Sequence, residues 1–422
     1  MSWEEFYFLL FEKDFYKLIF LYGINFLGLL LFFKKDINNL FDPLNIMIIN
    51  LSSCFAILIY LLIDGLIGYK YFYQLAVINV SFLITFKTVL SYKNIIILKK
   101  RLDVNFFKIY YIIHIILFFL TVMYFYKVIN TKLMINKFSP FDNQGLLKYA
   151  STFLFPGQLI LVFIKREMYG YKNKIDYLIY ILIFILFFFS GGRTSTITYF
   201  LYVFSILYFL NSIQVNYLYK KVKKYSLIIF ILGFIGVIVL FSLVNNENNL
   251  EIILKKILHR ILSSGDTYYM FYVNDNIKKI EGISFFYYYI FPIIYPILKR
   301  IINLKEIIYP GFQIIEVIYG LKTTYMGPNT RYDLVWQMNL GYFGIIGGIL
   351  SGILMGIIRK VKTLNFIFLE VIVILFVNLE TMITDFGLFG KFLFSCIFML
   401  SLLLSISYFI FKIIKCRKKV DL

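Results

Sequence analysis

Histidine and cysteine are nearly absent from this sequence. Its 422 residues include two histidines and three cysteines, which are His114, His259, Cys54, Cys396 and Cys416. Three cysteines that lie this far apart cannot form a disulfide framework or the paired spacing of a zinc site. Neither a disulfide nor a bound metal ion is therefore expected.

Charge is scarce as well, and polar stretches are short. Charged residues make up 16% of the sequence and hydrophobic residues 61%. No stretch is polar enough for a separate water-soluble domain, so a soluble globular fold is excluded. The sequence also lacks a P-loop, a dinucleotide-binding fingerprint and a DxD motif that would hold a metal-bound nucleotide sugar. A substrate that binds outside the cytoplasm would therefore have to arrive already activated.

Hydrophobic segments long enough to cross a bilayer recur along the chain. A membrane-spanning helix needs about 20 predominantly apolar residues. This criterion predicts spans at residues 15–33, 44–63, 71–91, 106–127, 146–164, 175–190, 194–211, 226–244, 335–358, 365–383 and 388–411. The second segment is less uniform, since it contains the polar residues Asn50, Ser52 and Ser53. The sequence predicts an all-α polytopic membrane protein with about 11 to 12 spans.

Lysine and arginine gather in alternate connections between these segments. The basic connections contain Lys34 and Lys35; Lys93, Lys99, Lys100 and Arg101; Lys165, Arg166, Lys172 and Lys174; Lys220, Lys221, Lys223 and Lys224; and Arg359, Lys360 and Lys362. The positive-inside rule places these connections, together with the basic tail, in the cytoplasm. The net charge of +20 is therefore interpreted as an orientation signal and not as a sign of nucleic-acid binding. The intervening connections are predicted to face outward.

The predicted topology divides the chain into three parts. Residues 1–244 form an N-terminal transmembrane bundle, residues 245–334 an external loop, and residues 335–422 the C-terminal transmembrane helices with a basic cytoplasmic tail. Within the loop, apolar residues recur at helical spacing over 250–261, which predicts an amphipathic helix in the outer interface. A second apolar run at 283–298 is interrupted by prolines and is predicted to be interfacial or re-entrant.

Three arginines on the outward connections oppose the orientation rule. Arg193 follows Gly191 and Gly192, Arg260 lies in the predicted amphipathic helix, and Arg331 ends a Pro-Asn turn directly before a span. Glycines let a backbone approach a ligand closely, and a guanidinium can grip phosphate through two parallel hydrogen bonds. The alternative is a turn residue whose side chain reaches lipid headgroups. We expect the three arginines to bind an anion at the outer face.

Four further polar residues on the outward side are candidates for proton transfer. They are His259, Asp266, Asp333 and Asp385. Each could accept a proton from a reacting group or could hold an arginine in place. The sequence alone leaves these alternatives open. His114 lies in the middle of a predicted span and is expected to make a satisfied contact between helices instead.

Glycine recurs at every fourth position in the span at 335–358. The repeated residues are Gly344, Gly348, Gly352 and Gly356. Small residues at this spacing form a helix face against which a second helix can pack closely. A packing role is therefore predicted for this face.

Taken together, the outward motifs resemble those of one protein family. The motifs are Gly191-Gly192-Arg193, His259-Arg260, Gly265-Asp266-Thr267-Tyr268-Tyr269 and Gly327-Pro328-Asn329-Thr330-Arg331. Their order, and their position around a long external loop, are similar to those of the Wzy-type O-antigen polymerases, also called oligosaccharide repeat unit polymerases.

Membership of that family would imply an inverting, metal-independent glycosyltransferase that resembles membrane enzymes of the C type. It would need no cofactor and would act at the bacterial inner membrane, with its site facing the periplasm. The donor would be a growing glycan on undecaprenyl diphosphate, and the acceptor a distal sugar hydroxyl of a lipid-linked repeat unit. Besides these substrates, the resemblance implies membrane lipids and a chain-length regulator protein as partners, and no nucleic acid.

The resemblance also implies a division of roles among the outward residues. Arg193, Arg260 and Arg331, with the glycines at 191–192, would hold the diphosphate. Asp266, His259, Asp333 or Asp385 would take the proton of the acceptor hydroxyl. Three other functions compete with this one. They are an O-antigen ligase, a lipid-linked oligosaccharide flippase and an integral-membrane sugar acetyltransferase, of which the last would need a histidine-centred cytoplasmic motif that the two histidines do not fit.

Overall fold

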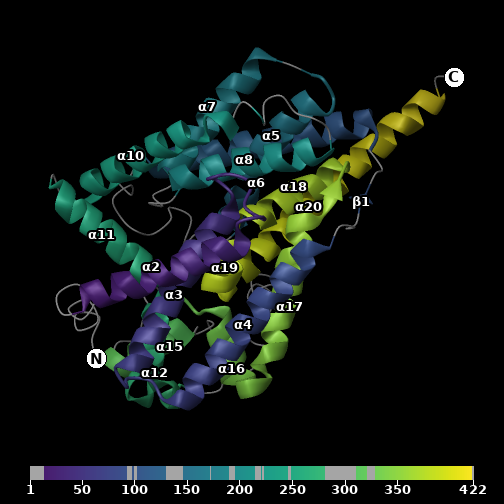
Figure 1. Ribbon diagram of the computed structural model, residues 1–422. Helices are drawn as coiled ribbons and strands as arrows, with labels where there is room; N and C mark the ends of the chain where they lie inside the picture. Colours follow the sequence, from purple (N-terminus) through teal and green to yellow (C-terminus); the bar gives the residue numbers. More distant parts are fainter. Residues whose placement is uncertain are drawn as a thin grey trace. The chain divides into compact units, whose positions relative to one another are not determined.

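In the computed structural model the chain is helical (Figure 1). The structure describes residues 14–92, 97–98, 102–129, 146–171, 173–189, 195–213, 220, 223–245, 249–280, 310–320 and 328–420. The longer helices are α2 (Phe15–Phe33), α3 (Pro43–Ile63), α4 (Tyr69–Ser91), α5 (Val104–Ile129), α6 (Leu146–Glu167), α7 (Lys174–Phe189), α8 (Ser195–Ile213), α10 (Ser226–Asn245), α11 (Leu250–Leu262), α17 (Ile345–Lys360), α18 (Phe366–Val377) and α20 (Phe386–Val420).

Shorter elements connect these helices. They are the 3₁₀ turns η3 (Ser263–Gly265), η4 (Val273–Lys279) and η5 (Gly341–Gly344), and the helices α12 (Asp266–Tyr272), α15 (Pro310–Tyr319), α16 (Tyr332–Leu340) and α19 (Leu379–Thr384). Two strands of two residues each, β1 (Ile97–Leu98) and β2 (Lys362–Thr363), pair in parallel.

The described residues of each predicted span lie largely in helix, and the all-α class is confirmed. Within the described residues, six helical stretches are long and apolar enough to cross a membrane: Phe15–Phe33, Pro43–Ile63, Tyr69–Ser91, Val104–Met123, Tyr332–Lys360 and Phe392–Cys416. The segment predicted at 365–383 is two helices, α18 and α19, that meet at Asn378. The predicted run at 283–298 lies outside the described residues.

The chain packs as two compact units, each assembled from separated stretches of sequence. Unit 1 comprises residues 1–93, 247–359 and 378–390. Unit 2 comprises residues 94–246, 360–377 and 391–422. Residues that are distant in sequence therefore meet inside each unit, and the candidate site described below lies in unit 1.

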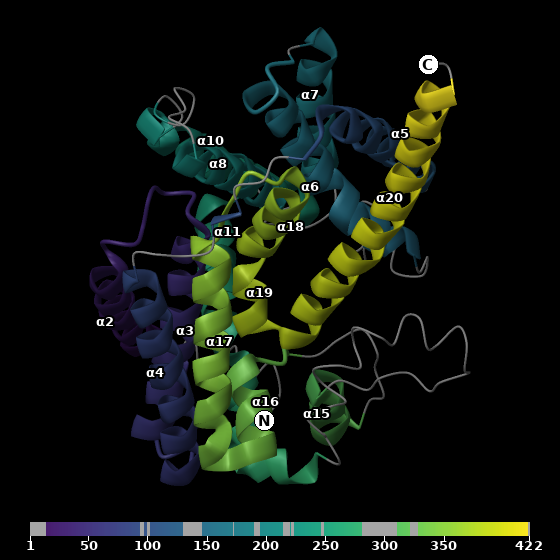
Figure 2. The ribbon, with the colours of Figure 1, turned by 90° about the vertical axis from the view of Figure 1, so that its right-hand side faces the viewer.

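In unit 1, α17 lies side by side with α4 (Figure 2), and its glycines allow this approach. A Cβ atom at Gly348 would overlap Ser81 Oγ and the Ile78 carbonyl oxygen. At Gly352 it would lie 2.8 Å from the Phe82 carbonyl oxygen, well inside normal contact. The predicted packing role of the glycine face is thus confirmed, because the backbones of the two helices are closer than any side chain would permit.

A buried ion pair joins α17 to the connection between α2 and α3. Arg359 Nη1 and Nη2 each donate to one carboxylate oxygen of Asp42 at 2.6 Å, and Nη2 also donates to the Asp36 carbonyl oxygen. Asp42 also caps α3, because its Oδ1 accepts from the Leu44 amide at 3.0 Å, with Pro43 at the first helical position. One carboxylate therefore fixes both the start of α3 and the end of α17.

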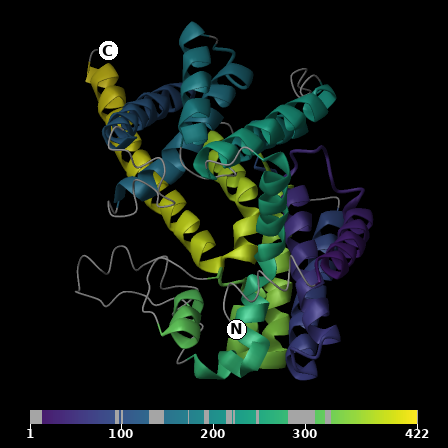
Figure 3. The same ribbon diagram turned by 90° about the vertical axis from the view of Figure 1, so that its left-hand side faces the viewer.

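The polar residues of α3 bind the end of α11, which runs beside it (Figure 3). Ser53 Oγ donates to the carbonyl oxygens of Ile261 and Leu262, and Cys54 Sγ to that of Ser264 at 3.3 Å. The carbonyls at a helix end have no partners within the helix, so side-chain donors are needed there. This accounts for hydroxyls within an otherwise apolar span.

Unit 2 is built around α18, which packs against α6 and α8. Phe366, at the start of α18, contacts the rings of Phe107 and Tyr110 on α5. Phe376, at the other end, contacts Tyr208 and Phe209 on α8. Aromatic rings at both ends of this short helix therefore fix its position within the unit.

Candidate functional site

Arg331 is fully buried at the start of α16 in unit 1. Its Nε donates to the phenolic oxygen of Tyr268 at 3.0 Å, and the same nitrogen lies 3.3 Å from Asp333 Oδ1. The guanidinium carbon also lies 5.3 Å from the centre of the Tyr268 ring. A charged group removed from water in this way is stable only where opposite charge and hydrogen bonds compensate it.

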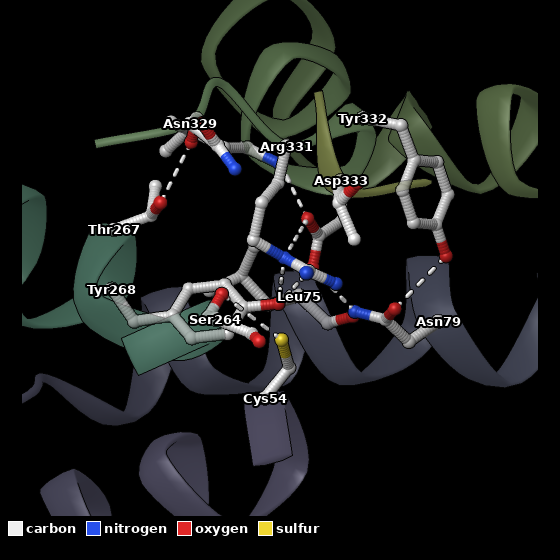
Figure 4. A network of polar contacts seen from close by, with 12 residues as sticks. Cys54, Leu75, Asn79, Ser264, Thr267, Tyr268, Asn329, Arg331, Tyr332 and Asp333 are labelled. Carbon is white, nitrogen blue, oxygen red and sulfur yellow. Dashed lines mark hydrogen bonds and ion pairs between the residues drawn. The ribbon is translucent and has the colours of Figure 1, made fainter. Parts of the chain in front are cut away.

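Asp333 supplies that compensation, and its own position is fixed by several donors (Figure 4). Its Oδ2 accepts hydrogen bonds from the Tyr268 hydroxyl at 2.5 Å and from Asn79 Nδ2 at 2.7 Å. Its Oδ1 accepts from the Leu334 amide at 3.0 Å. Both carboxylate oxygens are thus engaged within the protein, and the side chain has no exposed surface.

The network extends from α16 to α4 and α12. Tyr332 donates its hydroxyl hydrogen to Asn79 Oδ1 at 2.9 Å. One helical turn further along, Gln337 donates to Gln74 Oε1 at 2.8 Å and accepts from the Tyr272 hydroxyl at 3.0 Å. Two polar layers, one turn apart, therefore tie the three helices together.

Protonation in this network is set by burial and by the opposing charges. Burial, and then Asp333, raise the pKa of the Tyr268 phenol well above its ordinary value, against the opposite effect of Arg331. Burial lowers the pKa of Arg331, but the neighbouring acidic groups, Asp333 among them, outweigh that effect and raise the pKa well above its usual value. Tyr268 therefore stays a hydrogen-bond donor, and Arg331 stays a cation.

The two terminal nitrogens of Arg331 are the unusual feature of the site. Nη1 and Nη2 are both buried, and neither has a hydrogen-bond partner among the residues that the structure describes. A guanidinium carries five N–H hydrogens in a planar fork, and its Nη atoms are the pair that grips carboxylate or phosphate. Buried donors without acceptors are rare and costly. The arrangement therefore offers two parallel donors to an anionic oxygen pair.

The turn before α16 is held against α12 and α15. Thr267 Oγ1 donates to the Asn329 carbonyl oxygen at 2.7 Å. Gly311, in the first turn of α15, lies so close to Pro328 that a Cβ atom would overlap the Pro328 carbonyl oxygen. The Pro-Asn sequence thus delivers Arg331 to the interior of unit 1, and its place at the outer membrane edge stays a prediction.

The other predicted site residues are placed as follows. Asp266, which begins α12, is buried, and its Oδ1 lies 3.4 Å from Thr267 Oγ1. Asp385 is half-buried and ends α19, where its amide donates to the Thr381 carbonyl oxygen. His259 and Arg260 lie on α11. The side chains of His259 and Arg260, and the whole of Gly191, Gly192 and Arg193, fall outside the described residues.

Among the predicted candidates, the structure brings Arg331 and Asp333 into direct contact. It also puts Asp266 on the same short helix as Tyr268, which bonds to both of them. Whether Arg193 and Arg260 join this group stays a prediction.

Sequence analysis missed four residues of the network: Gln74, Asn79, Tyr272 and Gln337. One signal was available, since polar residues recur about one turn apart on three segments: 74 and 79, 268 and 272, and 333 and 337. Paired polar positions within apolar helices indicate a polar contact between helices. The spacing does not reveal which segments meet.

Comparison of the chain with protein-family models, curated proteins and solved structures finds no match.

Proposed function

We propose that this protein is an oligosaccharide repeat unit polymerase. It transfers a growing glycan from undecaprenyl diphosphate to the distal sugar of a new lipid-linked repeat unit, with inversion and without a metal ion. Its site faces the periplasm at the bacterial inner membrane. The supporting observation is the buried guanidinium of Arg331, whose Nη1 and Nη2 have no hydrogen-bond partner in the described part of the chain.

The chemistry of this reaction calls for such a group. When the glycosyl bond to the diphosphate breaks, negative charge develops on the departing oxygens. Donors that are already oriented, in a site from which water is excluded, stabilise that charge with no cost of reorganisation. Arg331 is held through Nε by Tyr268 and Asp333. Its remaining fork is therefore fixed in direction before a ligand arrives.

The contacts of Asp333 favour a positioning role in this proposal. Both of its oxygens already accept hydrogen bonds, from Tyr268, Asn79 and the Leu334 amide. A base must approach the acceptor hydroxyl directly, within about 2.6–3.2 Å. In our proposal Asp333 orients Arg331, and Asp266, His259 or Asp385 takes the proton. Arg193, Arg260 and the glycines at 191–192 complete the diphosphate site.

Deletion of the gene in its host tests the proposal against the alternatives. Loss of the polymerase should leave lipopolysaccharide that carries a single repeat unit. Lipopolysaccharide core without any repeat unit would indicate a ligase or a flippase. A full-length ladder of unchanged length, with altered acetylation, would contradict glycosyl transfer altogether.

A further inference from the structure

Unit 2 contains a second group of ionisable side chains, which the proposed reaction does not use. His114 on α5 and Glu370 on α18 both have no exposed surface, and His114 Nε2 lies 3.2 Å from Glu370 Oε1. Gln158 on α6 places its Oε1 2.8 Å from His114 Nδ1. Tyr110, one turn before His114, donates its hydroxyl hydrogen to Glu370 Oε2 at 2.8 Å. Three helices therefore close around one histidine–glutamate pair.

A glycine makes room for this pair. A Cβ atom at Gly157, on α6, would overlap Glu370 Oε1 and would lie 2.8 Å from His114 Nε2. The carboxylate and the ring therefore occupy the volume that a side chain at 157 would take. The contact therefore depends on the close packing of α6 against the helices that carry His114 and Glu370.

The hydrogens around this pair can be assigned from its contacts. His114 Nδ1 faces the oxygen of Gln158, so Nδ1 carries a hydrogen. Nε2 then faces Glu370 Oε1. Without a further proton, the lone pair of Nε2 would point at a carboxylate oxygen, and the two would repel each other. One proton between Nε2 and Oε1 removes the repulsion, whether it belongs formally to the ring or to the acid.

A turned amide at Gln158 would give a different assignment. Its nitrogen would donate to Nδ1, and a neutral ring would carry its hydrogen on Nε2. The other amide atom of Gln158 lies beside the Tyr111 hydroxyl, which can accept from a nitrogen or donate to an oxygen. Hydrogen-bond counting therefore does not choose between the two orientations, but charge does.

In the turned arrangement Glu370 would be a buried carboxylate with no compensating cation among its described neighbours. Within the described part of the chain, His114 is the ion-pair partner of Glu370. The other titratable groups that act on it are Tyr110 from α5 and Cys396 from α20, and neither can supply positive charge. Gln158, from α6, is neutral. An unpaired charge among apolar helices is strongly disfavoured, and groups in that position take up a proton instead.

We propose that His114 and Glu370 bind one proton between helices α5, α6 and α18 of unit 2. The proton comes from solvent and forms a shared N–H···O contact between Nε2 and Oε1, so that the pair is neutral overall. Release of the proton would leave one negative charge in the core and would loosen the contacts of α5, α6 and α18. The proton site does not depend on the proposed glycosyl transfer.

The scarcity of histidine allows a direct test on the full-length protein in lipid nanodiscs. The chain has two histidines, so in a His259→Gln variant labelled with ¹⁵N-histidine every ring signal comes from His114. At neutral pH we expect one of two results. Either the ring is doubly protonated, or it is neutral while infrared spectra show a protonated carboxylic acid that Glu370→Gln removes. A neutral ring together with an ionised Glu370 would overturn the proposal.

Two variants complete the test. In Glu370→Gln the ring of His114 should become singly protonated, because its negative partner is gone. The control Glu167→Gln removes a carboxylate that is 24% exposed at the end of α6 and should leave both signals unchanged. If Glu370→Gln fails to fold, the ring signal of the His259→Gln protein and the acid band of the wild type still give the number of protons in the pair. A control that shifts His114 as much as Glu370→Gln does would contradict the assignment.

Discussion

Arg331 uses its nitrogens in two different ways. Nε is bound inside the protein by Tyr268, whereas Nη1 and Nη2 are buried and have no hydrogen-bond partner within the described ranges. A lysine at this position would retain the charge but would present one ammonium group with no planar fork. An exchange of arginine for lysine at position 331 therefore keeps the positive charge and removes the planar pair of donors. It tests which of the two the proposed function needs.

We expect Arg331→Lys to abolish chain elongation while the protein still accumulates. Loss of one oriented donor to a developing negative charge lowers turnover roughly 100- to 1,000-fold, and the fork supplies two such donors. The measurement is the length distribution of lipopolysaccharide after complementation of the deletion strain, with the protein level checked by immunoblot. Arg359→Lys changes a second buried arginine among the described residues of unit 1, and if that protein accumulates it should retain long chains. Normal ladders from Arg331→Lys would contradict a diphosphate role for this residue.

Tyr268 is the second residue with a role that can be isolated. Its hydroxyl accepts from Arg331 Nε and donates to Asp333 Oδ2, so Tyr268→Phe removes both contacts at once. A buried polar atom left without its partner costs about 1–3 kcal/mol. The free energy of unfolding should fall by that order, and elongation should fall with it because the fork of Arg331 loses its support.

The matched control is Tyr272→Phe, which breaks a single hydroxyl contact to Gln337 in the adjacent layer. It should lower the unfolding temperature in lipid nanodiscs but leave the lipopolysaccharide ladder long. If both variants retained wild-type ladders, Tyr268 would be a structural residue and would have no part in positioning Arg331.

Among the elements, α17 allows a direct test of helix packing through its glycine face. Gly348→Ala should destabilise unit 1, because its Cβ atom would meet Ser81 Oγ and the backbone oxygen of Ile78. Forcing extra volume into a packed interface costs about 1–3 kcal/mol. The unfolding temperature of the purified protein, followed by size-exclusion chromatography after heating, should drop. Gly28→Ala on α2 is the control, since a Cβ atom there meets nothing within 4 Å. Equal stability of the two variants would mean that α4 and α17 do not pack through this face.

Elements were predictable where the pattern that encodes them is local. Runs of apolar residues located the long helices, and a four-residue glycine repeat located the packing face of α17. The amphipathic stripe of α11 was a weaker guide: Ile253 is buried, whereas Leu250 is 55% exposed. The break between α18 and α19 was not predicted, because neither helix contains a glycine or a proline.

The site was less predictable because its contacts join distant segments. Asn79 and Asp333 are 254 positions apart, and nothing in either local sequence specifies the other. The motifs did single out Arg331 and Asp333, since a charge directly before an apolar span needs a reason. They did not reveal that both carboxylate oxygens of Asp333 would accept hydrogen bonds from within the protein. That outcome depends on α4 and α12, which local patterns do not bring together.

For the whole molecule, the orientation of the chain is the expectation on which the proposed function depends. Basic connections alternate with connections poor in charge, which predicts that position 193 lies outside and position 220 in the cytoplasm. Cysteine accessibility distinguishes the two sides. Of the native cysteines, Cys54 and Cys396 are buried and Cys416 is exposed, so Cys416→Ser gives a background of low reactivity.

In that background, Arg193→Cys should react with a membrane-impermeant maleimide added to intact spheroplasts. Lys220→Cys should react only after the membrane is permeabilised. The physical reason is that cationic side chains next to a span are retained on the cytoplasmic side during insertion. An arginine predicted on the opposite face is therefore not explained by the orientation rule. Labelling of both positions from the same side would remove the basis for a shared outward anion site. Arg331 would then have to find its ligand without Arg193.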